Sequence, residues 1–202
     1  MQKVSSSKEI NKREEIVKAA AVCFAKKGYY GTTMNDIVDA VGISKGGIYW
    51  YFKSKRELYM ALLERRFEEA LSVVENVLVE GRPLRDILID GGLLFHRFVV
   101  EDEVFFTNTL EFLSESVRDE NIAKKLSEFY EKWLNTLLKH VSSASDAEEI
   151  TLEERRYIAM SILTFIHGTR FTGKVYKEIW DKFEELWVFF VDRILCKKGG
   201  ER

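Results

Sequence analysis

The fold is decided by residues 32–55, which read TTMNDIVDAVGISKGGIYWYFKSK. Thr33 followed by Asp36 is a capping box. In this motif the threonine hydroxyl accepts a hydrogen bond from the backbone amide three residues later, and the carboxylate accepts one from the amide of the threonine. Four apolar residues then recur at helical spacing, namely Met34, Ile37, Val38 and Val41. Gly42 suits the end of this helix because glycine readily takes a positive φ angle. The pattern predicts a helix of about two turns.

A second short helix is predicted over residues 45–52, directly after that turn. Ser44 is a suitable N-cap for it. Ile48 and Phe52 are four residues apart, so they share one apolar face that anchors the helix. Two short helices joined by a tight turn, the second anchored by one face only, are typical of a DNA-binding helix-turn-helix.

The polar face of this second helix predicts which residues touch DNA. Lys45 and Tyr49 lie one turn apart on it, where a recognition helix presents side chains to base edges in the major groove. Gly46 and Gly47 each lower helix stability by roughly 1 kcal/mol relative to alanine, a cost that close approach of the backbone to DNA explains. Lys55 lies in the first turn of the next helix, where its side chain and free amides can share a phosphate.

The run from Ala20 through Phe24, Gly28-Tyr29 and Thr32-Thr33 to residues 48–55 resembles the N-terminal domain of the TetR family of transcriptional repressors. The resemblance covers roughly residues 10–62, about a quarter of the chain. It implies an all-α fold and a DNA-binding role for this part of the chain.

The resemblance also implies which residues contact DNA, mostly at phosphates. The matching positions are Thr33, Lys45, Gly46, Gly47, Tyr49, Tyr51 and Lys55, and we add Asn35, Ser44 and Trp50 to the predicted surface. Trp50 suits packing against a neighbouring helix equally well. Gly47 departs from the family, many members of which have a side chain such as threonine there, so base recognition rests more on Lys45 and Tyr49.

Charge is distributed unevenly along the chain. The formal net charge of the 202 residues is −2. Residues 1–55 carry ten Lys or Arg and five Asp or Glu, a balance of +5, whereas residues 56–202 carry 21 and 28, a balance of −7. The positive charge therefore lies with the predicted DNA-binding segment, as binding to phosphates requires.

Helical spacing dominates the rest of the sequence, which has one proline and no alternation typical of strands. We expect an all-α protein of about nine helices, with a three-helix DNA-binding domain at residues 1–54 and a larger helical ligand-binding and dimerisation domain at 55–202. The long helix that follows the helix-turn-helix is expected to end near Gly81. The last two helices are expected at about 151–171 and 175–197.

These last two helices carry apolar or aromatic residues on more than one face. This is more apolar surface than packing against a single core requires. We therefore expect them to pack against a second copy in a two-fold four-helix interface, and the family resemblance implies the same homodimer. The residues expected in the interface are Ile158, Ile162, Phe165, Ile166, Trp180, Phe183, Trp187, Phe190 and Ile194. A purely intramolecular core is the alternative.

Aromatic residues of the middle helices are numerous enough to line an apolar cavity, although such stripes more often form plain core. The resemblance implies a small effector, whose binding changes the separation of two DNA-binding heads and releases a palindromic operator. We expect an elongated hydrophobic or aromatic effector in contact with Phe95, Phe98, Phe105, Asn108, Phe112, Phe129, Trp133 and Phe165.

Two other classes of function compete with this one. A DNA-binding architectural or constitutive regulator without a ligand fits the same helix-turn-helix. An enzyme fits less well, because no histidine, cysteine or acidic residue falls in a nucleophile–base pattern, a metal-ligand spacing or a phosphate loop. We therefore expect no catalytic residue, metal or cofactor. Without a signal peptide or a long uncharged apolar run, the sequence predicts a cytoplasmic protein that does not enter a membrane.

Overall fold

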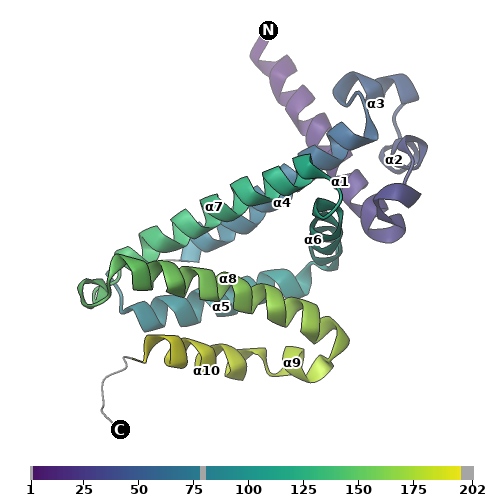
Figure 1. Ribbon diagram of the computed structural model, residues 1–202. Coiled ribbons are helices and arrows are strands. Elements are labelled where there is room, and N and C mark those ends of the chain that lie inside the picture. The colour runs from purple at the N-terminus through teal and green to yellow at the C-terminus, as the bar shows by residue number, and fades with distance from the viewer. Residues whose placement is uncertain (1, 78–80, 197–202) are drawn as a thin grey trace. The chain divides into compact units, whose positions relative to one another are not determined.

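The computed structural model describes residues 2–77 and 81–196, with ten α-helices, one 3-10 helix and no strand among them (Figure 1). The helices are α1 Gln2–Gly31, α2 Met34–Val41, α3 Lys45–Tyr51, α4 Lys55–Val77, α5 Leu84–Glu101, α6 Glu103–Ser116, α7 Glu120–Ser142, η1 Ala147–Glu149, α8 Leu152–Val175, α9 Lys177–Asp181 and α10 Phe183–Leu195. The all-α prediction is confirmed. None of the described helices is both long enough and apolar enough to cross a lipid bilayer.

The last expected helix is divided in two. Instead of one helix over residues 175–197, α9 ends before Lys182, whose φ of −104° and ψ of 19° interrupt the helical backbone. This break accounts for one more α-helix than the nine expected. The predicted end of α4 near Gly81 adjoins residues 78–80, which lie outside the described residues.

The chain forms two compact units. The first comprises residues 1–69 and 101–128, which hold α1, α2, α3, α6 and the first parts of α4 and α7. The second comprises residues 70–100 and 129–202, which hold α5, α8, α9 and α10 with the remaining parts of α4 and α7. The expected functional boundary between residues 54 and 55 stays a prediction.

The first unit has a core centred on α1. Its buried side chains recur every three or four residues and are those of Ile16, Val17, Ala20, Ala21 and Phe24. The Phe24 ring meets Tyr59 of α4 edge-on, with 5.1 Å between centroids, and Tyr59 lies 4.5 Å from the ring of Phe112 in α6. These aromatic contacts hold α1, α4 and α6 in one packed group.

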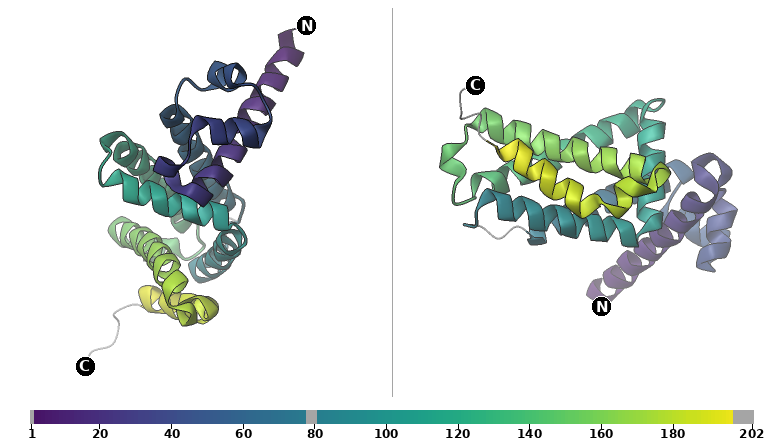
Figure 2. Two further views of the ribbon diagram at one scale, coloured as in Figure 1. Left: turned by 90° about the vertical axis from the view of Figure 1, so that its right-hand side faces the viewer. Right: turned by 90° about the horizontal axis from the view of Figure 1, so that it is seen from below.

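The second unit packs α8 and α10 side by side (Figures 1 and 2). Phe165 of α8 lies against Trp187 and Phe190 of α10, with ring centroids 5.5 Å and 4.2 Å apart. The indole of Trp187 also donates to the Leu88 carbonyl of α5 at 3.0 Å. Gly92 makes room for that indole, because a Cβ there would lie 2.0 Å from Cε2 of Trp187.

Replacing Gly92 by alanine should therefore destabilise the protein. The overlap with Trp187 forces a shift of packed atoms, for which overpacking typically costs about 1–3 kcal/mol. Gly168→Ala is the matched control, since a Cβ at that position of α8 meets no atom within 4 Å. Urea unfolding of both variants measures the effect; equal stability of the two would contradict the packing of Trp187 against α5.

Candidate DNA-binding site

The first helix of the predicted helix-turn-helix, α2, has the expected ends. Thr33 Oγ1 accepts the Asp36 amide at 3.2 Å, and the Asp36 carboxylate accepts the Thr33 amide at 2.7 Å, so the capping box is confirmed. Gly42 ends the helix in the left-handed conformation, with a φ of 71°. Hydrogen bonds from Lys27 and Thr33 hold the pKa of Asp36 well below its usual range, so the cap stays ionised.

The second helix, α3, separates a buried face from an exposed one, as predicted. Ile48 and the C-cap residue Phe52 are completely buried. Lys45 and Gly46 are exposed, and Tyr49 is 36% exposed. The buried pair thereby fixes the side of α3 that faces solvent, and that side carries the residues expected to read bases.

Most of the other residues that are expected to contact DNA lie on the surface around α3. The exposed ones are Thr33, Asn35, Ser44 and Trp50, and Tyr51 and Gly47 are partly exposed. Ser44 also caps α3 by accepting the Gly47 amide at 3.1 Å. Trp50 is 59% exposed and lies edge-on to Tyr51, so it is not buried against a neighbouring helix, and its contact with DNA stays a prediction.

Lys55 has an internal role that the sequence does not reveal. Its Nζ donates to the carbonyls of Tyr29 at 2.6 Å and Thr32 at 2.9 Å, and it lies 4.4 Å from the centre of the Tyr29 ring. The ammonium of a lysine has three donors, so one remains after these two hydrogen bonds. Lys55 therefore ties the start of α4 to the turn between α1 and α2, and its contact with a phosphate stays a prediction.

Two acidic residues of α6 hold the same turn. Gly28 has a φ of 72°, and this bend turns the Tyr29 amide towards a carboxylate oxygen of Glu111, which accepts it. Burial raises the pKa of Glu111, against the effect of that hydrogen bond. Glu115 accepts the Tyr30 hydroxyl at 2.9 Å. Neither carboxylate was predicted to hold this bend, and Gly28 is the one signal in the sequence that could have indicated it.

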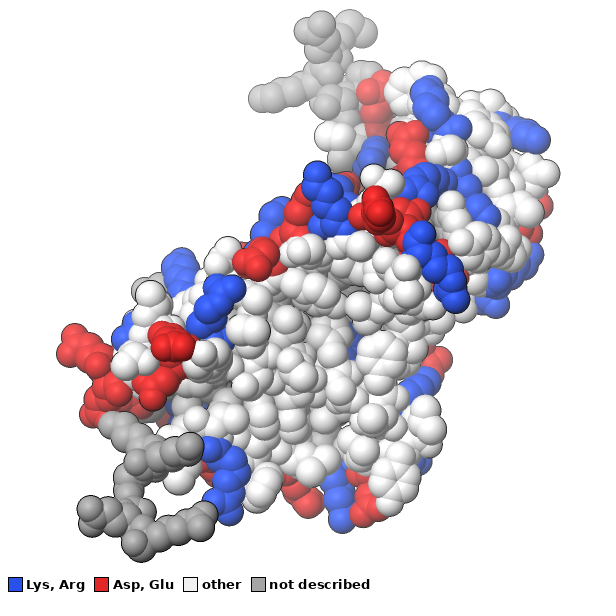
Figure 3. Space-filling model, viewed as in Figure 1, with Lys and Arg blue, Asp and Glu red and all other residues white. Residues whose placement is uncertain are grey.

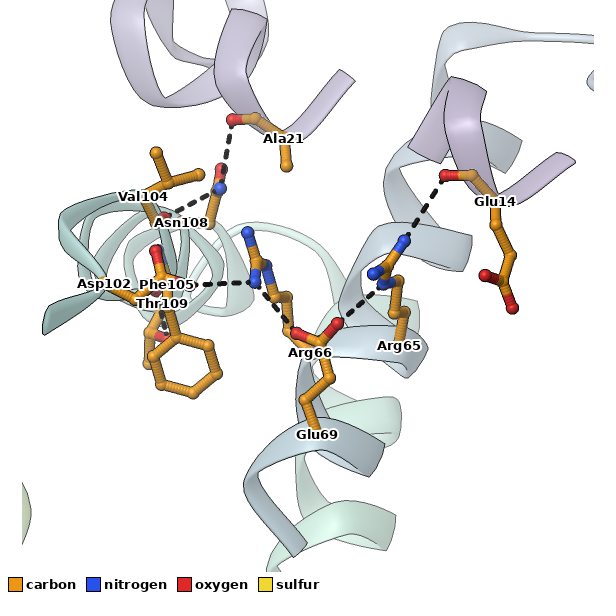
Figure 4. A network of polar contacts seen from close by, with 10 residues as sticks. All are labelled: Glu14, Ala21, Arg65, Arg66, Glu69, Asp102, Val104, Phe105, Asn108 and Thr109. Carbon is orange, nitrogen blue, oxygen red and sulfur yellow. Dashed lines mark hydrogen bonds and ion pairs between the residues drawn. The ribbon is translucent and has the colours of Figure 1, made fainter. Parts of the chain in front are cut away.

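A second polar network joins the same three helices (Figure 4). Arg66 of α4 donates to Glu69 at 2.9 Å and to Asp102, the N-cap of α6, at 3.3 Å. Asn108 of α6 donates to the Ala21 carbonyl of α1 at 3.1 Å. These contacts add to the aromatic packing, so α6 is attached to the helices that carry α2 and α3.

The residues expected to contact an effector fall into both units. Phe105, Asn108 and Phe112 are buried in the first unit, where they pack or bond against α1 and α4. The second unit contains Phe95, Phe98, Phe129, Trp133 and Phe165. Of these, Trp133 lines a small apolar cavity of about 30 Å³ with residues such as Ile162, Ile166 and Trp187. An effector contact at these residues stays a prediction.

The residues expected in a dimer interface also divide into two groups. Within a single chain the core already covers Ile158, Ile162, Ile166, Phe183 and Trp187, none of which is more than 7% exposed. Phe165, Trp180, Phe190 and Ile194 keep part of their surface exposed. The buried group therefore has little surface to offer a second copy, because its apolar stripe packs within the chain.

Comparison with known proteins identifies the segment that carries this geometry. The family model described as bacterial regulatory proteins, tetR family, matches residues 16–62. That range includes all of α2 and α3, the second half of α1 and the first turns of α4.

Several transcriptional regulators are similar to the chain. The repressor AcnR of Corynebacterium glutamicum is 32% identical over 139 residues, which cover 65% of this chain and 73% of AcnR. The uncharacterised regulator YerO of Bacillus subtilis is 30% identical over 191 residues, covering 91% of this chain. The matches span less than two thirds of some relatives, 63% of YerO and 36% of the Bacillus subtilis regulator YfiR.

Solved structures share the fold along most of the chain. Salmonella enterica GusR has a TM-score of 0.76 and 25% identity, over 92% of this chain and 96% of GusR. The fatty acid degradation regulator FadR of Bacillus halodurans has a TM-score of 0.75 at 19% identity, over 94% of this chain and 97% of FadR. Together with the extensive match to AcnR, these findings lead to one conclusion: the chain belongs to the TetR family of bacterial transcriptional regulators.

Proposed function

We propose that the protein is a transcriptional repressor that binds a roughly palindromic operator as a homodimer and leaves it when a small hydrophobic effector binds. The observation that carries this proposal is the exposed face of α3, where Lys45, Gly46 and Tyr49 lie opposite the buried Ile48 and Phe52. Repression is the activity named for the relative AcnR.

The exposed face of α3 suits the major groove. Lys45 at its first position can donate to guanine O6 and N7, and Tyr49 one turn later can reach a neighbouring base or a thymine methyl. A Cβ at Gly46 would have no atom within 4 Å, so DNA could approach the backbone closely at this position. Phosphate contacts by Thr33, Tyr51 and Lys55 would fix the register on the duplex.

A dimer is supported by an apolar stripe on α8 that remains exposed. Tyr157, Met160 and Phe171 are 57%, 45% and 42% exposed and recur at helical spacing, and Phe189 of α10 is 60% exposed. Figure 3 shows few charged residues over the middle of α8 in this view, whereas charged residues gather along the lower edge. Two copies joined there would present two α3 helices to successive turns of DNA, about 34–36 Å apart.

An effector in contact with Trp133 would have to enlarge the cavity beside that residue. The apolar cavity beside Trp133 is about 30 Å³ in this structure, close to the share of volume of one water molecule. An effector bound there would shift the population towards a state with a larger cavity, and it acts on DNA binding only if that state binds DNA differently.

Selection of bound duplexes from a random DNA pool tests the proposal. We expect enrichment of two inverted half-sites, with affinity that falls as salt concentration rises. Selection without any enriched sequence, or enrichment of a single unpaired half-site, would refute operator binding by a dimer.

Substituting Gly46 by alanine should separate folding from DNA binding. The added methyl meets no protein atom, and alanine favours a helix by about 1 kcal/mol, so stability should hold or rise while operator affinity falls. Gly47→Ala is the comparison, since its Cβ would lie 3.2 Å from the Ser44 Oγ that caps α3. Thermal melts and fluorescence anisotropy measure both properties; undiminished operator affinity in Gly46→Ala would exclude close backbone approach.

Lys45→Ala and Tyr49→Phe should each relax sequence preference at one operator position, with a loss of about 1–3 kcal/mol for the preferred base. Lys55→Met should instead weaken binding to every sequence and lower the salt slope by about 1. Because Lys55 also donates to the carbonyls of Tyr29 and Thr32, the melting temperature of the Lys55→Met variant should fall as well. Competition assays at several salt concentrations measure these effects, and identical profiles for the three variants would overturn the assigned roles.

The dimer should be disrupted by Met160→Glu, which places an unpaired charge in the exposed stripe of α8, whereas Met160→Leu keeps the stripe apolar. Light scattering at micromolar concentration should give twice the chain mass of 23.6 kDa, 2 × 23.6 = 47.2 kDa, for the wild type and Met160→Leu. Met160→Glu should shift towards 23.6 kDa. A wild-type monomer, or an unchanged dimer in Met160→Glu, would rule out this interface.

A further inference from the structure

The first unit contains a cavity of about 250 Å³ where α1, α4 and α6 meet. Lys18 and Val22 of α1, Leu62 and Arg66 of α4, and Val104 of α6 are among the residues that line it. None of the residues expected to contact DNA or an effector belongs to its lining. The cavity is therefore a candidate site of its own within the DNA-binding unit.

Three cationic side chains and no acidic one line this cavity in the described part of the chain. The cations are Lys18, Arg65 and Arg66. Both arginines donate to Glu69, and Arg66 also donates to Asp102 (Figure 4). Lys18 is exposed and makes no hydrogen bond or ion pair with a described residue. The two arginines are thus partly neutralised by carboxylates, whereas Lys18 has no carboxylate partner.

The cations keep hydrogen-bond donors for a ligand. In the described part of the chain Nη2 of Arg65 and Nη2 of Arg66 make no hydrogen bond, and neither does the buried Nε of Arg66. The Lys18 ammonium has three donors. Neither Glu14 nor Glu15, which lie within one turn before it on α1, forms an ion pair with it. Donors from α1 and α4 therefore face one cavity.

The rest of the cavity wall is apolar. It consists of Val17, Ala21, Val22, Leu62 and Val104. Three of these, Val17, Ala21 and Leu62, are at most 2% exposed, so they form a packed surface. An inorganic anion would satisfy the cations but leave this surface in contact with water, whereas a ligand with an apolar body covers it.

The size of the cavity limits its ligand. Sites for drug-sized molecules typically have volumes of about 300–1,000 Å³. The cavity between α1, α4 and α6 is smaller, at about 250 Å³. It suits a molecule with a single ring and one charged group.

We propose that this cavity binds a small aromatic monocarboxylate, whose carboxylate lies among Lys18, Arg65 and Arg66 and whose ring packs against the apolar wall. Guanidinium groups present parallel donors that match the two oxygens of a carboxylate. A ligand held in this way contacts α1, α4 and α6 together, so it stabilises the packing that supports α2 and α3. This site is separate from the hydrophobic effector proposed above and does not depend on it.

Calorimetry with the full chain tests the site without DNA. The probes are benzoate, benzyl alcohol, which has the same ring without the charge, and inorganic phosphate, all at constant ionic strength. We expect the dissociation constant of benzoate to be at least about tenfold lower than that of benzyl alcohol, as charge-assisted hydrogen bonds predict, with phosphate also weaker than benzoate. No saturable binding of benzoate, or binding of either other probe as tightly as benzoate, would overturn the proposal.

Methyl resonances of the full chain locate the bound ring. Benzoate should shift the methyl signals of Val22 and Val104, because both residues line the cavity. Val175, which is 91% exposed in the second unit, is the reference and should not shift. Shifts confined to residues of the second unit would contradict a site between α1, α4 and α6.

Lys18→Met should raise the dissociation constant of benzoate about threefold, the effect typical of an exposed charge pair, and leave that of benzyl alcohol unchanged. Lys26→Met is the matched control and should behave like the wild type, because Lys26 is an exposed lysine of α1 that does not line the cavity. Lys18→Gln is the second variant, should circular dichroism show that Lys18→Met does not fold. Unchanged benzoate affinity in the folded Lys18 variant would contradict the proposed contact.

Discussion

The structure of the DNA-binding part depends on how the turn after α1 is held. Lys55 donates to the carbonyl of Tyr29, near the end of α1, and to that of Thr32 in the turn, while Glu111 of α6 accepts a hydrogen bond from the Tyr29 amide. Gly28 makes the arrangement possible by taking a φ of 72°, and a Cβ there would stand 3.1 Å from the Glu111 carboxylate. Residues from α4 and α6 thereby fix where the chain leaves α1 and enters α2.

Holding this turn matters because α2 and α3 are too short to be stable alone. Isolated helices shorter than about 12–15 residues are marginal in water, and α3 has seven residues with two glycines. Burial of Ile48 and Phe52 supplies the missing stability and, at the same time, sets the direction of the opposite face. The same packing that keeps α3 folded therefore presents Lys45 and Tyr49 to solvent, so folding and recognition use complementary faces of one helix.

Local signals predicted this part of the molecule well. The capping box at Thr33, the left-handed Gly42 and the Ser44 cap act over three or four residues, so they can be found without knowing the tertiary structure. Lys55 was harder, because its partners lie 26 and 23 residues earlier in the chain. Hydrophobic periodicity placed α8 correctly but did not show which stripe packs inside one chain, and it missed the break at Lys182.

The most direct test of the central claim is amide hydrogen exchange of the full chain with and without its selected operator DNA. If α3 enters the groove while the turn after α1 and the start of α4 fix its position, added protection should concentrate in residues 32–55. A control duplex of scrambled sequence at the same salt concentration should give much weaker protection there. Protection confined to the second unit, or none between residues 32 and 55, would contradict the assignment of α3 as the helix that reads DNA.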